Sequence, residues 1–225
     1  MNKQIWQKGR HGKLYLWRIG MFSVLIRVFC CFPVDARETT DAGDRQKMPV
    51  GIFGGFGFDY LEISSGESME IGVHGGVIFN RWLSSGVYFN GIFTLNPLKD
   101  MQSGRDANVL CGHGGIFVAP IVFPNALVHV SFPVFAGYGH VNYELYNSAE
   151  LSNYIESSCR FWMIEPGMEI EMNVLSFVRV AVGGYYKRTS KIRLAYAGSV
   201  DGEPILPENV LNGFSVGLKL RFGKF

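Results

Sequence analysis

Apolar residues alternate one by one with small or polar residues along most of the chain after residue 48. Because successive side chains of a β-strand point to opposite faces, this period of two predicts strands. No comparable helical period follows the N-terminal segment. We predict eight strands, with two of them inside residues 107–143 and the others at about 49–62, 68–80, 82–95, 158–172, 175–188 and 211–225.

Residues 107–143 contain no Asp, Glu, Lys or Arg. A soluble protein rarely has so long a stretch without charge, because part of every surface element faces water. Prolines and glycine clusters would break a membrane helix here repeatedly. What remains is a hairpin with a tight turn at 123–126 and an apolar outer face, which is typical of a bilayer-spanning β-barrel.

The connections between the predicted strands alternate in length. Tight turns are expected at 80–81, 124–125 and 173–174, and longer polar loops at 96–107, 145–157 and 189–210, with 64–67 as a short exception. Outer-membrane barrels have this asymmetry, with short turns at one end and long loops at the other. We therefore expect eight antiparallel strands with both termini on the short-turn side.

The second face of each strand indicates which side points inward. If the apolar faces lay inside, the opposite faces would carry many charges for water, but they carry mainly Gly, Ser and His. That composition suits a narrow lumen packed with side chains. We predict an all-β fold, an eight-stranded antiparallel up-and-down transmembrane β-barrel, over residues 49–225.

Aromatic residues near the strand ends are placed to form girdles at the two membrane surfaces. The rings expected at the short-turn end are Trp82, Phe123 and Phe177. Those expected at the opposite end are Tyr60, Tyr143 and either Tyr185 or Tyr186.

Residues 1–36 have the features of an export signal, a basic region followed by an apolar segment at 21–34. Met1 and Met21 are both possible starts, cleavage is expected near Arg37, and residues 37–48 form a lead-in. Six of the 21 Lys and Arg and one of the 19 acidic residues lie in this signal, which leaves 15 basic and 18 acidic residues, a net charge of −3. No basic stripe interleaved with aromatics remains, so we expect no nucleic-acid partner.

The strand ladder, the loop asymmetry and the C-terminal strand with its final Phe225 resemble the small eight-stranded outer-membrane barrels of the OmpA/OmpX kind from Gram-negative bacteria. The resemblance covers residues 49–225. It implies a place in the cell outer membrane, contact with outer-membrane lipid, and a terminal aromatic residue read by the barrel assembly machinery. Phe225 is out of phase with Phe222, so either Phe222 has that role or the strand bulges near Gly223.

Ionisable side chains on the predicted lumen face concentrate on the last three strands. They are Glu165 and Glu169 on the sixth strand, Arg179 on the seventh, and Lys219 and Arg221 on the eighth. Because a buried charge must be paired, we predict a salt-bridge network that plugs the lumen, with Arg179 bonded to Glu165 or Glu169. A gated ion path or a catalytic cluster is the alternative.

Cys111 and Cys159 are the only cysteines after residue 36. An oxidising compartment permits a disulfide. One predicted strand lies between them, which separates the Cα atoms by about 9–10 Å, beyond the reach of about 7 Å. The spacing favours two free thiols, and a bridge closed by barrel curvature stays open as the alternative.

No catalytic, cofactor or metal site is expected. The histidines are scattered singly, without H-x-H or H-E-x-x-H spacing. We predict a monomeric, non-enzymatic outer-membrane barrel with a structural or surface-interaction role. The alternatives are a lipid-modifying enzyme on the same scaffold and a soluble lipocalin-like ligand binder.

Overall fold

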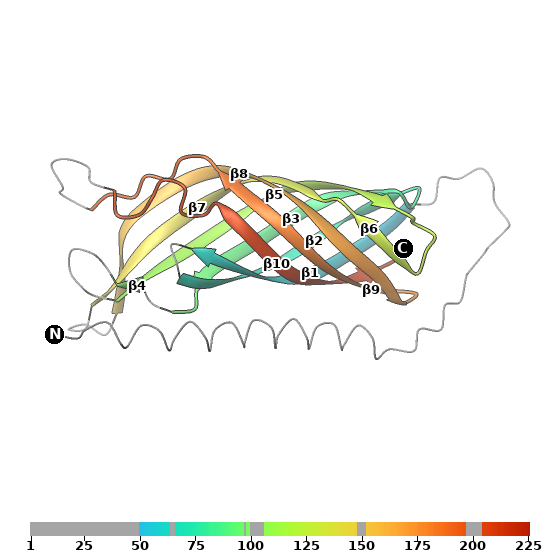
Figure 1. Ribbon diagram of the computed structural model, residues 1–225, viewed down its shortest axis with the longest axis horizontal. Coiled ribbons are helices and arrows are strands. Elements are labelled where there is room, and N and C mark those ends of the chain that lie inside the picture. Colours follow the sequence, from blue (N-terminus) through green and yellow to red (C-terminus); the bar gives the residue numbers. More distant parts are fainter. Residues whose placement is uncertain (1–49, 64–65, 97, 100–105, 148–151, 197–203) are drawn as a thin grey trace, which may run out of the picture. The chain divides into compact units, whose positions relative to one another are not determined.

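The computed structural model describes residues 50–63, 66–96, 98–99, 106–147, 152–196 and 204–225 (Figure 1). The predicted signal peptide and lead-in lie outside these residues. The strands are β1 (Val50–Ile63), β2 (Gly66–Phe79), β3 (Leu83–Thr94), β4 (Leu98–Lys99), β5 (Asp106–Val122), β6 (Val128–Ser131), β7 (Val134–Asn147), β8 (Ser152–Leu175), β9 (Val178–Thr189) and β10 (Gly213–Gly223). No helix in this part of the chain is long and apolar enough to cross a membrane.

Antiparallel pairing closes the strands into a ring, visible in Figure 1. β1 pairs with β2, β2 with β3 and β3 with β5, while β8, β9 and β10 follow in order until β10 pairs back with β1. β6 and β7 pair with β5 in one common register and with β8 in another, so together they form one interrupted strand of the ring between β5 and β8. Pro133, which has no amide N–H to donate, lies at the break between them. With β4 as a short addition beside β5, the predicted eight-stranded antiparallel barrel is confirmed.

Tight turns join the strands at one end of the barrel. In the β2–β3 turn, Asn80 and Arg81 have φ angles of 50° and 65°. Positive φ at two consecutive residues suits the twist of a β-hairpin, and the Trp82 amide closes the turn by donating to the Phe79 carbonyl at 3.2 Å. The turn after β8 lies at 176–177 and not at 173–174 as predicted, because β8 continues to Leu175.

The start of β1 and the end of β10 both lie on the short-turn side, as predicted. Val50 at the start of β1 pairs with Phe79 at the end of β2. Phe53 pairs with Gly223 at the end of β10. The Gly223 amide donates to the Phe177 carbonyl in the β8–β9 turn, at 3.0 Å.

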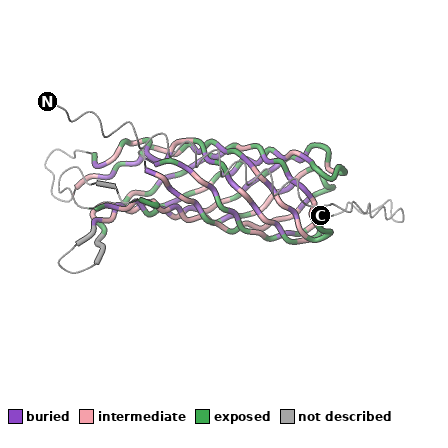
Figure 2. The backbone as a smooth tube through the Cα atoms, turned by 60° about the horizontal axis from the view of Figure 1, so that its bottom comes forward, coloured by how far each residue is buried: buried purple, intermediate pink, exposed green. Residues whose placement is uncertain are grey.

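Buried and exposed residues alternate along each strand (Figure 2). On β10, Phe214 is 78% exposed, whereas Lys219 and Arg221 on the other face are 7% and 5% exposed. The apolar faces therefore surround the barrel, and the faces that carry glycine and charge point into the lumen, as their composition predicted.

The aromatic rings beside the turns are exposed on the outside, and these are Trp82, Phe123 and Phe177. At the other end Tyr186 is exposed, with its ring centroid 4.7 Å from that of Phe214. Tyr60 is half-buried on the outer face. The expectation for Tyr143 was wrong: it is 2% exposed, because it has the odd-numbered inward phase of Val141 on β7.

Candidate functional site

Two groups of charged side chains occupy the lumen. The turn-side cluster consists of Glu169, Glu171, Arg179, Lys219 and Arg221. The loop-side cluster consists of Glu70, His113, Glu165 and Lys187. Every one of these side chains belongs to a residue that is at most 7% exposed, so each charge depends on partners within the barrel.

Arg221 joins the two carboxylates of the turn-side cluster. Its Nη2 donates to Glu169 Oε2 at 2.5 Å and its Nη1 to Glu171 Oε1 at 2.7 Å. Its Nε donates to His74 Nε2 at 3.2 Å. Lys219 Nζ lies 2.9 Å from Glu169 Oε1. Charge-assisted hydrogen bonds of this kind are stronger than neutral ones, and here they tie β10 to β8 across β9.

Arg179 binds Glu171 and not the partners that the sequence predicted. Its Nη1 lies 3.0 Å from Glu171 Oε2, and its Nε donates to Asn173 Oδ1 at 2.9 Å. No ion pair within the described residues joins Arg179 to Glu165 or Glu169. The register is the reason: it sets Arg179 opposite Asn173, so the side chain reaches residue 171, while the other two carboxylates lie further along β8.

His129 and Ser131 of β6 also bind Glu171. His129 Nε2 lies 3.0 Å from Glu171 Oε2, and Ser131 Oγ donates to Glu171 and, at 3.3 Å, to Glu169. In the part of the chain that the structure describes, no hydrogen bond joins Ser131 to His129. Ser131 and His129 thus each bind the Glu171 carboxylate.

Lys187 of β9 binds Glu70 of β2 at the centre of the loop-side cluster. Its Nζ lies 3.7 Å from Glu165 Oε1 and 3.4 Å from His113 Nε2. His113 Nε2 lies 3.2 Å from Glu70 Oε1. The network expected from the sequence omitted Lys187. Lys187 has the same odd-numbered, inward phase on β9 as Arg179, so the alternation along this strand could have identified it.

Aromatic side chains lie in the lumen between the charges. The Phe117 ring centroid lies 6.3 Å from that of Phe53 and 5.5 Å from that of Phe135. Lys219 Nζ lies 4.4 Å from the Phe135 centroid and 4.0 Å from the Tyr185 centroid, in favourable cation–π contact. A void of about 10 Å³ beside Lys219 has room for about one water molecule.

The described part of the β9–β10 connection, residues 190–196 and 204–212, packs into the loop end of the barrel core. The Ile205 amide donates to the Leu194 carbonyl at 2.8 Å. The buried apolar residues of this segment are Ile192, Leu194, Ile205, Val210 and Leu211. A connection that the sequence predicted as a polar loop thus extends the apolar interior.

Cys111 and Cys159 are free. Both pair with Val141 of β7, one from β5 and one from β8. The prediction of free thiols separated by one strand is confirmed.

The last two aromatic residues point to opposite sides. Phe222 is 44% exposed on the outer face. The Phe225 ring centroid lies 6.3 Å from that of Phe53 and 4.2 Å from the Arg179 guanidinium. β10 keeps its register with β1 up to Gly223, without a bulge. Of Phe222 and Phe225, Phe222 is therefore the one that faces outward, and its role in assembly stays a prediction.

The closed ring of eight antiparallel strands is the fold of the small outer-membrane β-barrels. Neisserial surface protein A has a similar structure, with a TM-score of 0.50 and 10% identity over 78% of this chain and 97% of that one. The N-terminal barrel domain of OprF from Pseudomonas aeruginosa has a TM-score of 0.43 and 11% identity, over 79% and 99%. Ail, the attachment invasion locus protein of Yersinia pestis, has a TM-score of 0.38 and 12% identity, over 79% and 97%. No protein-family model and no curated protein sequence matches the chain.

Proposed function

We propose that the protein is a monomeric, integral protein of the cell outer membrane, with a plugged lumen and a structural or surface-interaction role, and without catalysis. The observation that supports the plugged lumen is that its charged side chains form ion pairs with one another. An eight-stranded barrel is just wide enough for side chains to fill. The void of about 10 Å³ beside Lys219 is too small for a continuous column of water.

The lengths of the strands support a role outside the bilayer. A transmembrane β-strand needs about 9–11 residues, whereas β8 has 24 and β9 has 12. Thr189 at the end of β9 pairs with Met163, so residues 152–162 of β8 extend past β9 at the loop end. β7 accompanies them, since Asn147 pairs with Ser152. The outermost part of this β7–β8 wall, residues 152–159 of β8 with the part of β7 that pairs with them, offers a surface to partners outside the membrane.

Conductance measurements test the plugged lumen. Purified protein in planar bilayers is expected to give no stable single-channel current, while a general porin in the same bilayers shows that the assay detects open barrels. The heat-dependent change of mobility in SDS gels verifies that the protein tested is folded. Stable currents from the wild-type barrel would contradict the plug and favour the ion path.

Fractionation and lipid analysis test the other two proposed properties. The protein is expected in the membrane fraction, released only by detergent and monomeric by light scattering; recovery from the aqueous fraction would favour the lipocalin-like alternative. Mass spectra of lipid A are expected to be identical for the parent strain, the deletion strain and the complemented deletion strain. A difference that complementation reverses would favour the lipid-modifying enzyme.

A further inference from the structure

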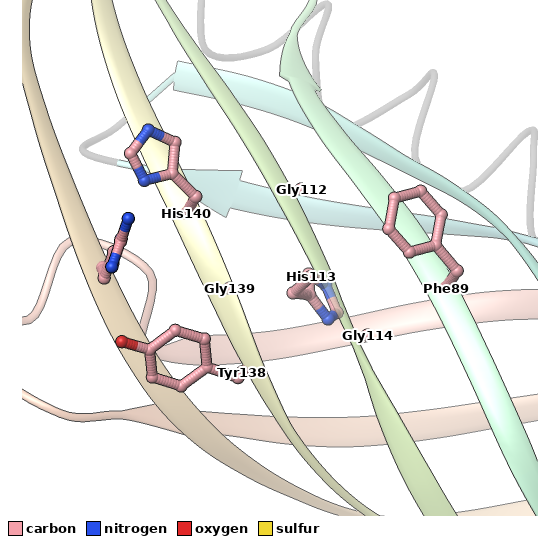
Figure 3. A pocket seen from close by; sticks show the side chains of 8 residues that line it. Phe89, Gly112, His113, Gly114, Tyr138, Gly139 and His140 are labelled. Atoms are coloured by element: carbon pink, nitrogen blue, oxygen red, sulfur yellow. The ribbon is translucent and has the colours of Figure 1, made fainter.

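A groove of about 540 Å³ lies on the outer face of the barrel, over β3, β5, β7 and β8, within the size range of small-molecule sites. Gly112 and Gly114 of β5 form its floor, and Phe89 and Tyr138 stand on either side (Figure 3). Phe89 and Tyr138 are 64% and 58% exposed, so the walls project outward from the barrel.

The groove exists because glycines occupy neighbouring outward positions. Gly91 of β3 pairs with Gly112 of β5, and a Cβ added at Gly112 would meet no atom within 4 Å. Nearby outward positions on the same strands carry bulky side chains, since Val87 and Ile116 are 63% and 62% exposed. The glycines therefore leave a depression in a surface that is otherwise covered by large apolar groups.

The loop end of the groove is basic. Gly112 pairs with His140, and His140 pairs with Arg160 of β8, both exposed on the outer face. Two residues nearer the turns, Tyr138 lies opposite Trp162, and such rings favour the membrane–water interface. His140 and Arg160 consequently lie at the depth of lipid headgroups. Among the described residues, neither has an acidic partner.

We infer that this groove binds one anionic phospholipid of the surrounding bilayer. An acyl chain lies over Gly112 between Phe89 and Tyr138, and the phosphate contacts Arg160 and His140. A guanidinium donates two parallel hydrogen bonds to phosphate, and basic residues beside the apolar region attract anionic headgroups. The inference rests on the proposed location of the barrel in a bilayer.

Tryptophan quenching by brominated lipid tests the site, because Trp162 lies two residues from Arg160. The full-length mature protein with Trp82→Phe keeps Trp162 as the reporter beside the groove, and the protein with Trp162→Phe keeps Trp82 at the short-turn end. Each is reconstituted into phosphatidylcholine vesicles that contain a minor fraction of brominated phosphatidylglycerol or brominated phosphatidylcholine. Phosphatidylglycerol is expected to be favoured about fivefold at Trp162, the effect of one basic side chain near a membrane, and not at Trp82.

Two substitutions in the Trp82→Phe protein locate the lipid. Arg160→Gln removes the headgroup contact and Gly112→Leu fills the floor of the groove, and each is expected to abolish the preference at Trp162. Gly54→Leu is the matched control. Gly54 lies exposed on β1, away from the groove, and a Cβ there also meets no atom within 4 Å, so this variant should keep the preference.

Three outcomes would overturn the inference, and they are distinguishable. Equal quenching of Trp162 by both brominated lipids means that ordinary boundary lipid covers the groove. Loss of the preference with Arg160→Gln but not with Gly112→Leu means that surface charge acts without the groove. If neither lipid quenches either tryptophan, the barrel has not inserted, and the proposed membrane location fails together with the site.

Discussion

The substitution Glu171→Gln is expected to cost the barrel about 3–5 kcal/mol, the range for breaking a buried ion pair from one side. In the turn-side cluster two carboxylates, Glu169 and Glu171, face three cations, Arg179, Lys219 and Arg221. After the substitution one carboxylate faces three cations, and Arg179 loses its acidic partner. Glu171 is 1% exposed, so water cannot take over its bonds. Glutamine keeps the volume of the side chain, which leaves the loss of charge as the main change.

The double variant Glu171→Gln/Arg179→Met tests this reasoning. Because it removes the cation left without a partner, it should be more stable than Glu171→Gln alone, with a coupling of about 0.5–3 kcal/mol. Glu208→Gln is the control. Glu208 forms ion pairs of 3.1 and 3.2 Å with Lys191 and Arg193, similar in length to those of Glu171, but its side chain is 40% exposed. Water screens such pairs, so a far smaller loss is expected.

Urea unfolding of the refolded barrel in one detergent or vesicle system measures these differences, followed by tryptophan fluorescence and by gel mobility. If Glu171→Gln loses no more stability than Glu208→Gln, the lumen is hydrated enough for its charges to be independent. If the double variant is no more stable than Glu171→Gln, Arg179 does not depend on Glu171, and the pairing in the turn-side cluster is not what holds the lumen closed.

Four further predictions concern the two cysteines, the Trp82 girdle position, the last two phenylalanines and the β9–β10 connection. Both cysteines should react with a maleimide after unfolding without reductant, and a reductant-dependent gel shift would show a bridge instead. The emission of Trp82 should be quenched more by lipid brominated near the headgroup than at the chain end, because its ring is 51% exposed beside the β2–β3 turn; the opposite order would contradict the girdle. Phe222→Ser should lower the amount assembled in cells and Phe225→Ser chiefly the stability in detergent, whereas equal assembly of both variants would remove Phe222 as the signal. Leu194→Ala should cost about 2–5 kcal/mol as a large-to-small core change, and no measurable cost would show that its loop does not belong to the core.

The sequence alone predicted the number of strands and the face that points inward on each of them. It did not predict their bounds, since most of the loop expected at 145–157 is strand, with β7 ending at Asn147 and β8 starting at Ser152. The period of two assigns Glu169, Arg179 and Arg221 to the lumen, and the same phase extended along β9 assigns Lys187 there as well. The inward position of Tyr143 follows from the same alternation, because Tyr143 is odd-numbered on β7 like the buried Val141. The odd–even alternation predicts these sides correctly because the direction of a side chain in a strand is a local property of the backbone.

Only the tertiary structure determined which of these inward residues meet. Lys187 and Glu70 are 117 positions apart in the sequence and lie on β9 and β2, which are not neighbours in the ring. Arg179 binds Glu171 because of the register between β8 and β9. Residues 190–196 and 204–212 pack into the core where composition suggested a polar loop. The outer groove likewise needs Gly114 of β5 to lie between Phe89 of β3 and Tyr138 of β7. The alternation of residues along a strand determines which side chains point inward. The register between strands and the closure of the ring depend on all eight strands together, so a local sequence pattern does not predict them.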